Sequence, residues 1–304
     1  MLTYFLFALG FVALVKGADW LVTGSSAIAK RLGISDFVIG LTIVSVGTSA
    51  PELIVNVLAS INGNAGIAIG NVLGSNIANV FLILGISAII YGLPIQRNTV
   101  LSEIPFSLAA ALLVGFLANT DIFGLEHNEH GLGRIDGVII LFFFGLFLLY
   151  VFTLPSAKED SRDPTIQAMS GAKAGLLTVI GVIALFFGGK WVVDGAMQLA
   201  QYFGMSEAFI GLTVVAIGTS LPELVTSAMA AYRRNADIAV GNVVGSNIFN
   251  ILLILGLSSV IRPLPFQQNS NIDLLVVVFS GALIILSLAI GRRLVIKRYD
   301  GVIF

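Results

Sequence analysis

A repeat at a fixed offset of 171 residues is the feature that most constrains the fold of this chain. Residues 40–49, GLTIVSVGTS, return as residues 211–220, GLTVVAIGTS. Residues 70–79, GNVLGSNIAN, return at the same offset as residues 241–250, GNVVGSNIFN. Because chance does not keep one offset across separate segments, the chain consists of two copies of one structural unit.

The apolar content indicates that both copies consist of membrane-spanning helices. Hydrophobic residues make up 57% of the 304 residues and charged residues only 11%, whereas about a quarter of a soluble domain is charged. A spanning helix needs about 20 mainly apolar residues. Apolar runs between polar breaks predict helices at about 3–28, 36–60, 66–91, 99–119 and 135–154 in the first copy, and at about 174–199, 207–231, 237–261 and 272–291 in the second.

The predicted fold is an all-α polytopic membrane protein with about ten transmembrane helices, the last incomplete in this chain. Residues 1–154 form the first repeat, residues 155–173 a polar linker, and residues 174–304 the second repeat. Because five helices per unit is an odd number, the second copy is inverted relative to the first. Residues 299–304 resemble residues 135–140, which open the fifth helix. We therefore expect about 15–20 further apolar residues to complete a tenth helix in the natural protein.

The distribution of positive charge predicts the orientation, because cytoplasmic loops carry an excess of Lys and Arg. The loops on one side hold only Arg134 and Arg262. The loops on the other side hold twelve basic residues: Lys30, Arg31, Arg97, Lys158, Arg162, Lys173, Arg233, Arg234, Arg292, Arg293, Lys297 and Arg298. We expect an integral protein of the plasma membrane, with the linker in the cytoplasm and the N-terminus outside.

Composition also excludes several classes of function. The net charge of −1 provides no basic field for a nucleic-acid partner. Cysteine is absent, so a disulfide or a thiolate metal site is not available. We expect no cofactor and no enzymatic activity, because the chain shows no nucleophile, metal-binding histidine or phosphate loop. The sequence does not indicate an oligomeric state.

The second helix of each repeat carries a Gly-Thr-Ser-x-Pro-Glu motif that ends at Glu52 in the first copy and at Glu223 in the second. Pro51 has no N–H and must bend or open its helix, which frees backbone oxygens around Gly47 and Thr48. A carboxylate at mid-bilayer costs about 2.5–3.5 kcal/mol on insertion scales. Because the motif occurs twice, each time with a glutamate, it indicates a functional site rather than a helix kink alone.

The third helix of each repeat carries a polar stripe on an otherwise apolar surface. Its residues lie at i, i+4 and i+8: Asn71, Ser75 and Asn79 in the first copy, and Asn242, Ser246 and Asn250 in the second. The glycines at i−1 and i+3 of each stripe form small-xxx-small pairs that allow close helix packing. Hydrogen bonding between helices is an alternative role for the stripe.

These residues offer only oxygen ligands for a cation. Calcium takes 6–8 oxygens at about 2.3–2.6 Å, and the two glutamates balance its charge. Neutral serine and asparagine oxygens suit sodium. The absence of cysteine and of intramembrane histidine argues against zinc, copper or nickel, and magnesium is disfavoured because it resists losing its waters.

At these motifs the chain resembles the sodium/calcium exchangers of the cation/calcium antiporter superfamily, and the two segments resemble the paired alpha repeats of that family. The resemblance implies alternating-access exchange of sodium for calcium, with both ions bound near the midplane. It implies calcium ligands at Thr48, Glu52, Thr219 and Glu223. The sodium ligands it implies are Ser49, Ser75, Asn79, Ser220 and Ser246, with carbonyls at Ser45 and Ala216.

Two departures from the patterns of related branches bear on coupling. Asn250, the last member of the candidate site, stands where potassium-dependent members have Asp, which disfavours potassium co-transport. Gly74-Ser75 stands where proton-coupled members usually have Glu soon after Gly-Asn, which disfavours proton coupling. A proton/calcium antiporter stays the main alternative, followed by a cation channel gated by the glutamates and by a membrane enzyme that uses them as acid and base.

Charges outside the two motifs are assigned structural or interfacial roles. Lys16 with Asp19, and Lys190 with Asp194, have the spacing of local helical pairs. Glu103, early in the fourth helix, is expected near the lipid headgroups.

Overall fold

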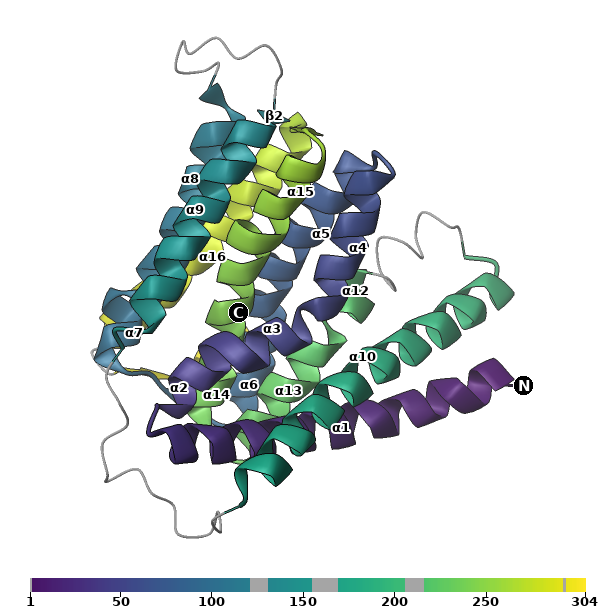
Figure 1. The fold of residues 1–304 in the computed structure, drawn as a ribbon, viewed down its shortest axis with the longest axis vertical. Coiled ribbons are helices and arrows are strands. Elements are labelled where there is room, and N and C mark those ends of the chain that lie inside the picture. Colours follow the sequence, from purple (N-terminus) through teal and green to yellow (C-terminus); the bar gives the residue numbers. More distant parts are fainter. Residues whose placement is uncertain (1, 121–130, 155–168, 206–215, 292–293) are drawn as a thin grey trace.

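The computed structural model of the protein describes residues 2–120, 131–154, 169–205, 216–291 and 294–304 (Figure 1). Within these ranges, seven helices are long and apolar enough to cross a membrane, and a bent pair counted as one span gives an eighth. The predicted polytopic helical fold is confirmed.

The helices of the first repeat follow the predicted order. They are α1 (Leu2–Leu32), α2 (Asp36–Ile39), η1 (Gly40–Val44), α3 (Ser45–Thr48), α4 (Ala50–Ile61), α5 (Ala65–Ala78), η2 (Asn79–Leu84), α6 (Gly85–Ile90), α7 (Arg97–Leu101), α8 (Glu103–Ala118) and α9 (Arg134–Val151). The segments η1 and η2 are π-helical. They continue the neighbouring α-helices, so α2 to α3 and α5 to α6 each form one run.

The second repeat has the same order. Its described helices are α10 (Gly171–Tyr202), α12 (Ala216–Thr219), α13 (Leu221–Tyr232), α14 (Ala236–Ile248), the π-helical η6 (Phe249–Leu255), α15 (Gly256–Ile261), α16 (Gln268–Gly291) and the short α17 (Asp300–Ile303). The first part of the helix predicted at 207–231 lies outside the described residues, as does most of the predicted linker.

The first helices of the two repeats, α1 and α10, lie side by side and cross the other long helices at a steep inclination (Figure 1). A Cβ added at Gly10 would lie 2.9 Å from the Gly188 carbonyl oxygen, and one at Gly17 would lie 2.9 Å from that of Gly181. Residue numbers therefore rise along α1 as they fall along α10. Equivalent helices run antiparallel, and the two repeats are inverted.

The run from α14 to α15 is the centre of the molecule. Its most apolar window is 94% buried, compared with 28–33% for the windows in α1, α8, α9, α10 and α16. The run from α5 to α6 is next, with 56% buried. Because both runs carry the polar stripes, the fold places those stripes in the interior and the less buried helices around them.

Two short antiparallel strand pairs join the repeats at the ends of the helices. Strand β1 (Leu93–Pro94) pairs with β4 (Val295–Ile296), and β2 (Gly131–Leu132) pairs with β3 (Leu264–Pro265). The Leu-Pro dipeptides of β1 and β3 occupy equivalent positions in the two repeats, so both copies use this dipeptide to pair with a strand of the other repeat.

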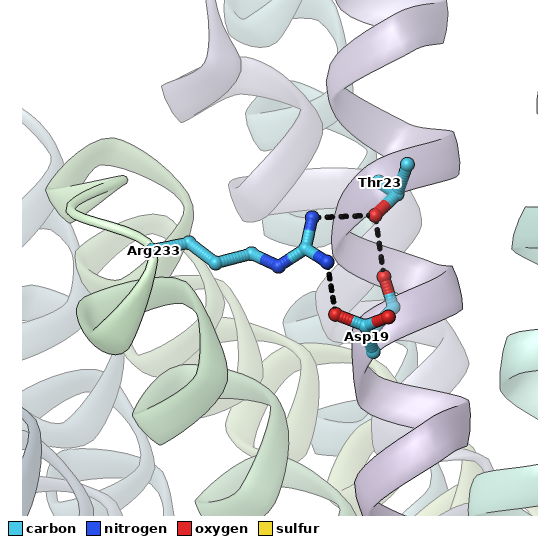
Figure 2. Close-up of polar contacts among 3 residues, drawn as sticks. All are labelled: Asp19, Thr23 and Arg233. Carbon is cyan, nitrogen blue, oxygen red and sulfur yellow. Dashed lines mark hydrogen bonds and ion pairs between the residues drawn. The ribbon is translucent and has the colours of Figure 1, made fainter. Parts of the chain in front are cut away.

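A charged contact links α1 to the end of α13 (Figure 2). Arg233 donates to the carboxylate of Asp19 and, at 2.7 Å, to Thr23 Oγ1. Lys190 pairs with Asp194 at 3.2 Å, as predicted. The prediction that Asp19 pairs with Lys16 is wrong, because the guanidinium of Arg233 reaches Asp19 from a residue distant in sequence.

Glu103 has a partner on a neighbouring helix. Its side chain is 1% exposed and accepts a hydrogen bond of 2.6 Å from the Tyr150 hydroxyl. The contact between α8 and α9 therefore buries this carboxyl group, and its position near the lipid headgroups stays a prediction.

Candidate cation-binding site

Both repeats break their second helix at a serine. Ser49 separates α3 from α4 with φ −83° and ψ 7°, and Ser220 separates α12 from α13 with φ −87° and ψ 4°. The run before α4 and α4 itself meet at a bend of 49°. Because Pro51 and Pro222 have no N–H to donate to the preceding turn, the predicted break is confirmed in each copy.

The break places each glutamate in the first turn of a new helix, Glu52 in α4 and Glu223 in α13. A helix N-terminus favours negative charge because its N–H groups point toward it. The side chain of Glu52 is 1% exposed and that of Glu223 is 2% exposed. The backbone therefore supports two carboxylates at positions that water does not reach.

The two stripes contact the broken helices of the opposite repeat through pairs of equivalent hydrogen bonds. Thr48 Oγ1 lies 3.1 Å from Asn242 Oδ1, and its equivalent Thr219 Oγ1 lies 3.4 Å from Asn71 Oδ1. Each contact joins one repeat to the other, so these side chains meet only where the two copies meet.

The serines repeat this arrangement. Ser49 Oγ lies 3.1 Å from Ser246 Oγ, and Ser220 Oγ lies 3.4 Å from Ser75 Oγ. Ser49 also donates to Glu223 Oε1 at 2.8 Å. The four predicted serine ligands thus form two pairs between the repeats, one of which contacts Glu223.

Buried acceptor oxygens without a hydrogen-bond partner include Glu52 Oε2, Glu223 Oε2, Asn79 Oδ1 and Asn250 Oδ1. Neither glutamate forms an ion pair with a described Lys or Arg side chain. Because unpaired buried charge is costly, this arrangement fits a cation that supplies the missing positive charge.

The structure does not test the two predicted carbonyl ligands, those of Ser45 and Ala216. The Ser45 carbonyl accepts hydrogen bonds from the Ser49 N–H at 2.9 Å and from Thr48 Oγ1 at 3.2 Å. Ala216 opens α12, and its side chain lies outside the described residues. The assignment of these two carbonyls, and of the full ligand set, stays a prediction.

Small residues of α14 allow close packing beside the site. A Cβ at Gly245 would lie 2.5 Å from the Leu41 carbonyl oxygen, and one at Gly241 would lie 2.7 Å from that of Phe37. The equivalents of Leu41 and Phe37 in the second repeat fall within 206–215, outside the described residues. Close contact between a stripe helix and the backbone of a broken helix is therefore described along α14.

The sequence analysis did not select Asn76 and Asn247 as site residues. Asn76 Nδ2 donates to the Asn247 carbonyl at 3.2 Å, and Asn79 Nδ2 donates to Asn247 Oδ1 at 2.9 Å. Asn250 Nδ2 donates to Asn76 Oδ1 at 3.0 Å. The sequence signal that could have identified them is that each follows a Gly-Ser pair at the same position of its repeat, Gly74-Ser75 in the first and Gly245-Ser246 in the second.

The fold and the site define a helical membrane protein of the secondary-transporter type, with two inverted repeats around a buried, oxygen-lined and negatively charged centre. The chain belongs to the sodium/calcium exchanger protein family, whose model matches residues 2–153 and 173–304.

Relatives of known name span nearly the whole chain. The sodium/calcium exchanger MaX1 of Methanosarcina acetivorans is 37% identical over 332 residues, covering 99% of this chain and 94% of that protein. The inner membrane protein YrbG of Escherichia coli is 36% identical over 285 residues, covering 89% and 85% respectively. A solved structure of the sodium-calcium exchanger NCX_Mj, soaked with Na⁺ and Ca²⁺, superposes with a TM-score of 0.84 at 35% identity, covering 100% of this chain and 95% of that one.

Proposed function

We propose that the protein is an antiporter that exchanges sodium for calcium across the membrane by alternating access. The observation that carries this proposal is the pair of buried glutamates, Glu52 and Glu223, each with a carboxylate oxygen that has no hydrogen-bond partner. Two negative charges balance one calcium ion, and the inverted repeats supply one charge each. The family membership and the names of the relatives support the same activity.

Calcium and sodium share the site in this proposal. The glutamate carboxylates and the Thr48 and Thr219 carbonyls bind calcium, which prefers many oxygen ligands. Neutral oxygens take part in sodium binding: those of Ser49, Ser75, Ser220 and Ser246, of Asn79 and Asn250, and the carbonyls of Ser45 and Ala216. Glu223, a calcium ligand in this proposal, is hydrogen-bonded to Ser49, a sodium ligand. An ion bound by Glu223 therefore changes the position of Ser49, and an ion bound by Ser49 changes that of Glu223. Calcium and sodium should for this reason compete for the site.

Alternating access is supported by the inverted repeats, which are typical of secondary transporters that open one central site to each side of the membrane in turn. Following the distribution of Lys and Arg, we place the protein in the plasma membrane with the N-terminus outside and the linker in the cytoplasm.

Purified protein in sodium-loaded liposomes tests the proposal. Calcium uptake should start when the external sodium is diluted, and it should be absent from vesicles without internal sodium. It should need neither potassium nor an imposed pH gradient, because Asn250 and the Gly74-Ser75 pair lack the acidic groups of those branches.

Each alternative gives a different outcome in the same vesicles. A proton/calcium antiporter runs on a pH gradient without sodium. A channel conducts calcium without any counter-ion and does not saturate at high calcium. Uptake of either kind contradicts sodium/calcium exchange.

A further inference from the structure

Two buried asparagines outside the proposed ligand set lie where the repeats cross. Asn76 is 0% exposed and Asn247 is 8% exposed. Asn76 is followed three residues later by Asn79, and Asn247 is followed three residues later by Asn250. Each contacts the asparagine of the opposite repeat, Asn76 with Asn250 and Asn247 with Asn79.

The contacts of Asn76 determine which way its amide is turned. The backbone carbonyl of Asn247 can only accept a hydrogen bond, so the group that faces it at 3.2 Å must be the Asn76 nitrogen. The oxygen of Asn76 then faces Asn250. An oxygen acceptor requires a donor, so Asn250 presents its nitrogen at 3.0 Å.

The consequence lies at the other end of the Asn250 amide. Its oxygen is turned away from Asn76, is buried, and has no hydrogen-bond partner. Asn79 is in the same state, because its nitrogen donates to Asn247 and its oxygen has no partner. Asn250 lies one turn beyond Ser246, which contacts Ser49 beside Glu223. The free oxygens therefore border the glutamate site.

We propose that Asn76 is a positioning residue that fixes the amide of Asn250 with its oxygen available to a bound sodium ion. Sodium is the relevant cargo because a neutral amide oxygen adds a ligand without adding charge. The inference rests on the proposed sodium/calcium exchange. It deepens that proposal by adding a residue that orients a ligand without contacting the ion.

The test compares Asn76→Ala in two backgrounds, the natural chain and Asn250→Asp. The measurement is the sodium concentration that gives half-maximal exchange in liposomes. In the natural chain, loss of the orienting hydrogen bond should raise this concentration about two- to tenfold. A carboxylate offers an oxygen whichever way it is turned, so in the Asn250→Asp background the same substitution should change it less than about twofold.

Asn119→Ala is the matched control. Asn119 and Asn271 form an amide pair between α8 and α16 at 2.8 Å and 2.9 Å. Its loss should lower the melting temperature and leave the sodium dependence unchanged. If Asn76→Ala does not fold, Asn76→Ser replaces it, because a hydroxyl can donate or accept and so does not dictate how Asn250 is turned.

Two results would overturn the inference. One is an equal loss of sodium sensitivity in both backgrounds, which indicates a general structural role for Asn76. The other is an unchanged sodium dependence in the natural chain. If the natural chain shows no sodium-driven exchange, the proposed function fails separately. The sodium-induced shift in melting temperature of the purified protein then decides the role of Asn76 by the same comparison.

Discussion

Replacing either site glutamate with glutamine should strongly weaken calcium binding and stabilise the ion-free protein. Glu52 and Glu223 are at most 2% exposed, and each has a carboxylate oxygen without a partner. The Glu52→Gln or Glu223→Gln substitution leaves a calcium ion in this site with one compensating charge instead of two.

The two effects have opposite signs. Removing one partner of a buried charge pair costs about 3–5 kcal/mol, and each 1.4 kcal/mol is a factor of ten. Calcium should therefore bind about 10²- to 4 × 10³-fold more weakly. Without calcium, the natural protein buries two carboxyl groups that no described Lys or Arg side chain balances. Replacing one of them with a neutral amide removes part of that cost, so the melting temperature in chelator should rise.

Thermal unfolding in detergent, with chelator and then with a calcium titration, measures both effects on one sample. Glu103→Gln is the control, because Glu103 is also 1% exposed but pairs with Tyr150 outside the site. That variant should keep the calcium-induced shift of the natural protein. If Glu52→Gln or Glu223→Gln keeps that shift too, or melts lower in chelator, the charge-balance reasoning is wrong.

Two further substitutions test the packing around the site. Gly245→Ala should lower stability by about 1–3 kcal/mol, because its Cβ would lie 2.5 Å from the Leu41 carbonyl oxygen. An unchanged melting temperature would contradict the close packing of α14 against η1. Charge reversal at Arg233 or Asp19 alone should lower the melting temperature. Reversal of both should recover most of that loss. If the double variant recovers nothing, the pair does not contribute to stability.

The sequence predicted the architecture well because its strongest signals are local. A proline after a Gly-Thr-Ser run removes a hydrogen bond wherever the helix lies, so the breaks at Ser49 and Ser220 could be placed without coordinates. The helix bounds followed from apolar runs that end at polar residues. The inversion followed from the odd number of helices in each repeat.

Contacts between distant segments could not be predicted in the same way. Arg233 reaches Asp19 across 214 residues, whereas helical spacing indicated the local partner Lys16, three positions before Asp19. The π-helical segment that begins at Asn79 has no compositional signature, because packing between the repeats determines its extra residue. The direction in which Asn76 turns its amide depends on one backbone carbonyl of the other repeat.

The mirrored contacts of the site also bear on how this protein can change over generations. Thr48 touches Asn242 of the other repeat, and Thr219 touches Asn71, as equivalent residues do across a symmetric dimer interface. The two halves of the gene therefore do not encode two independent sites, because each half encodes the residues that contact those of the other half. A harmful substitution at Thr48 should be compensated at Asn242 and not at Asn71, so the partners that co-vary should lie in opposite halves of the gene.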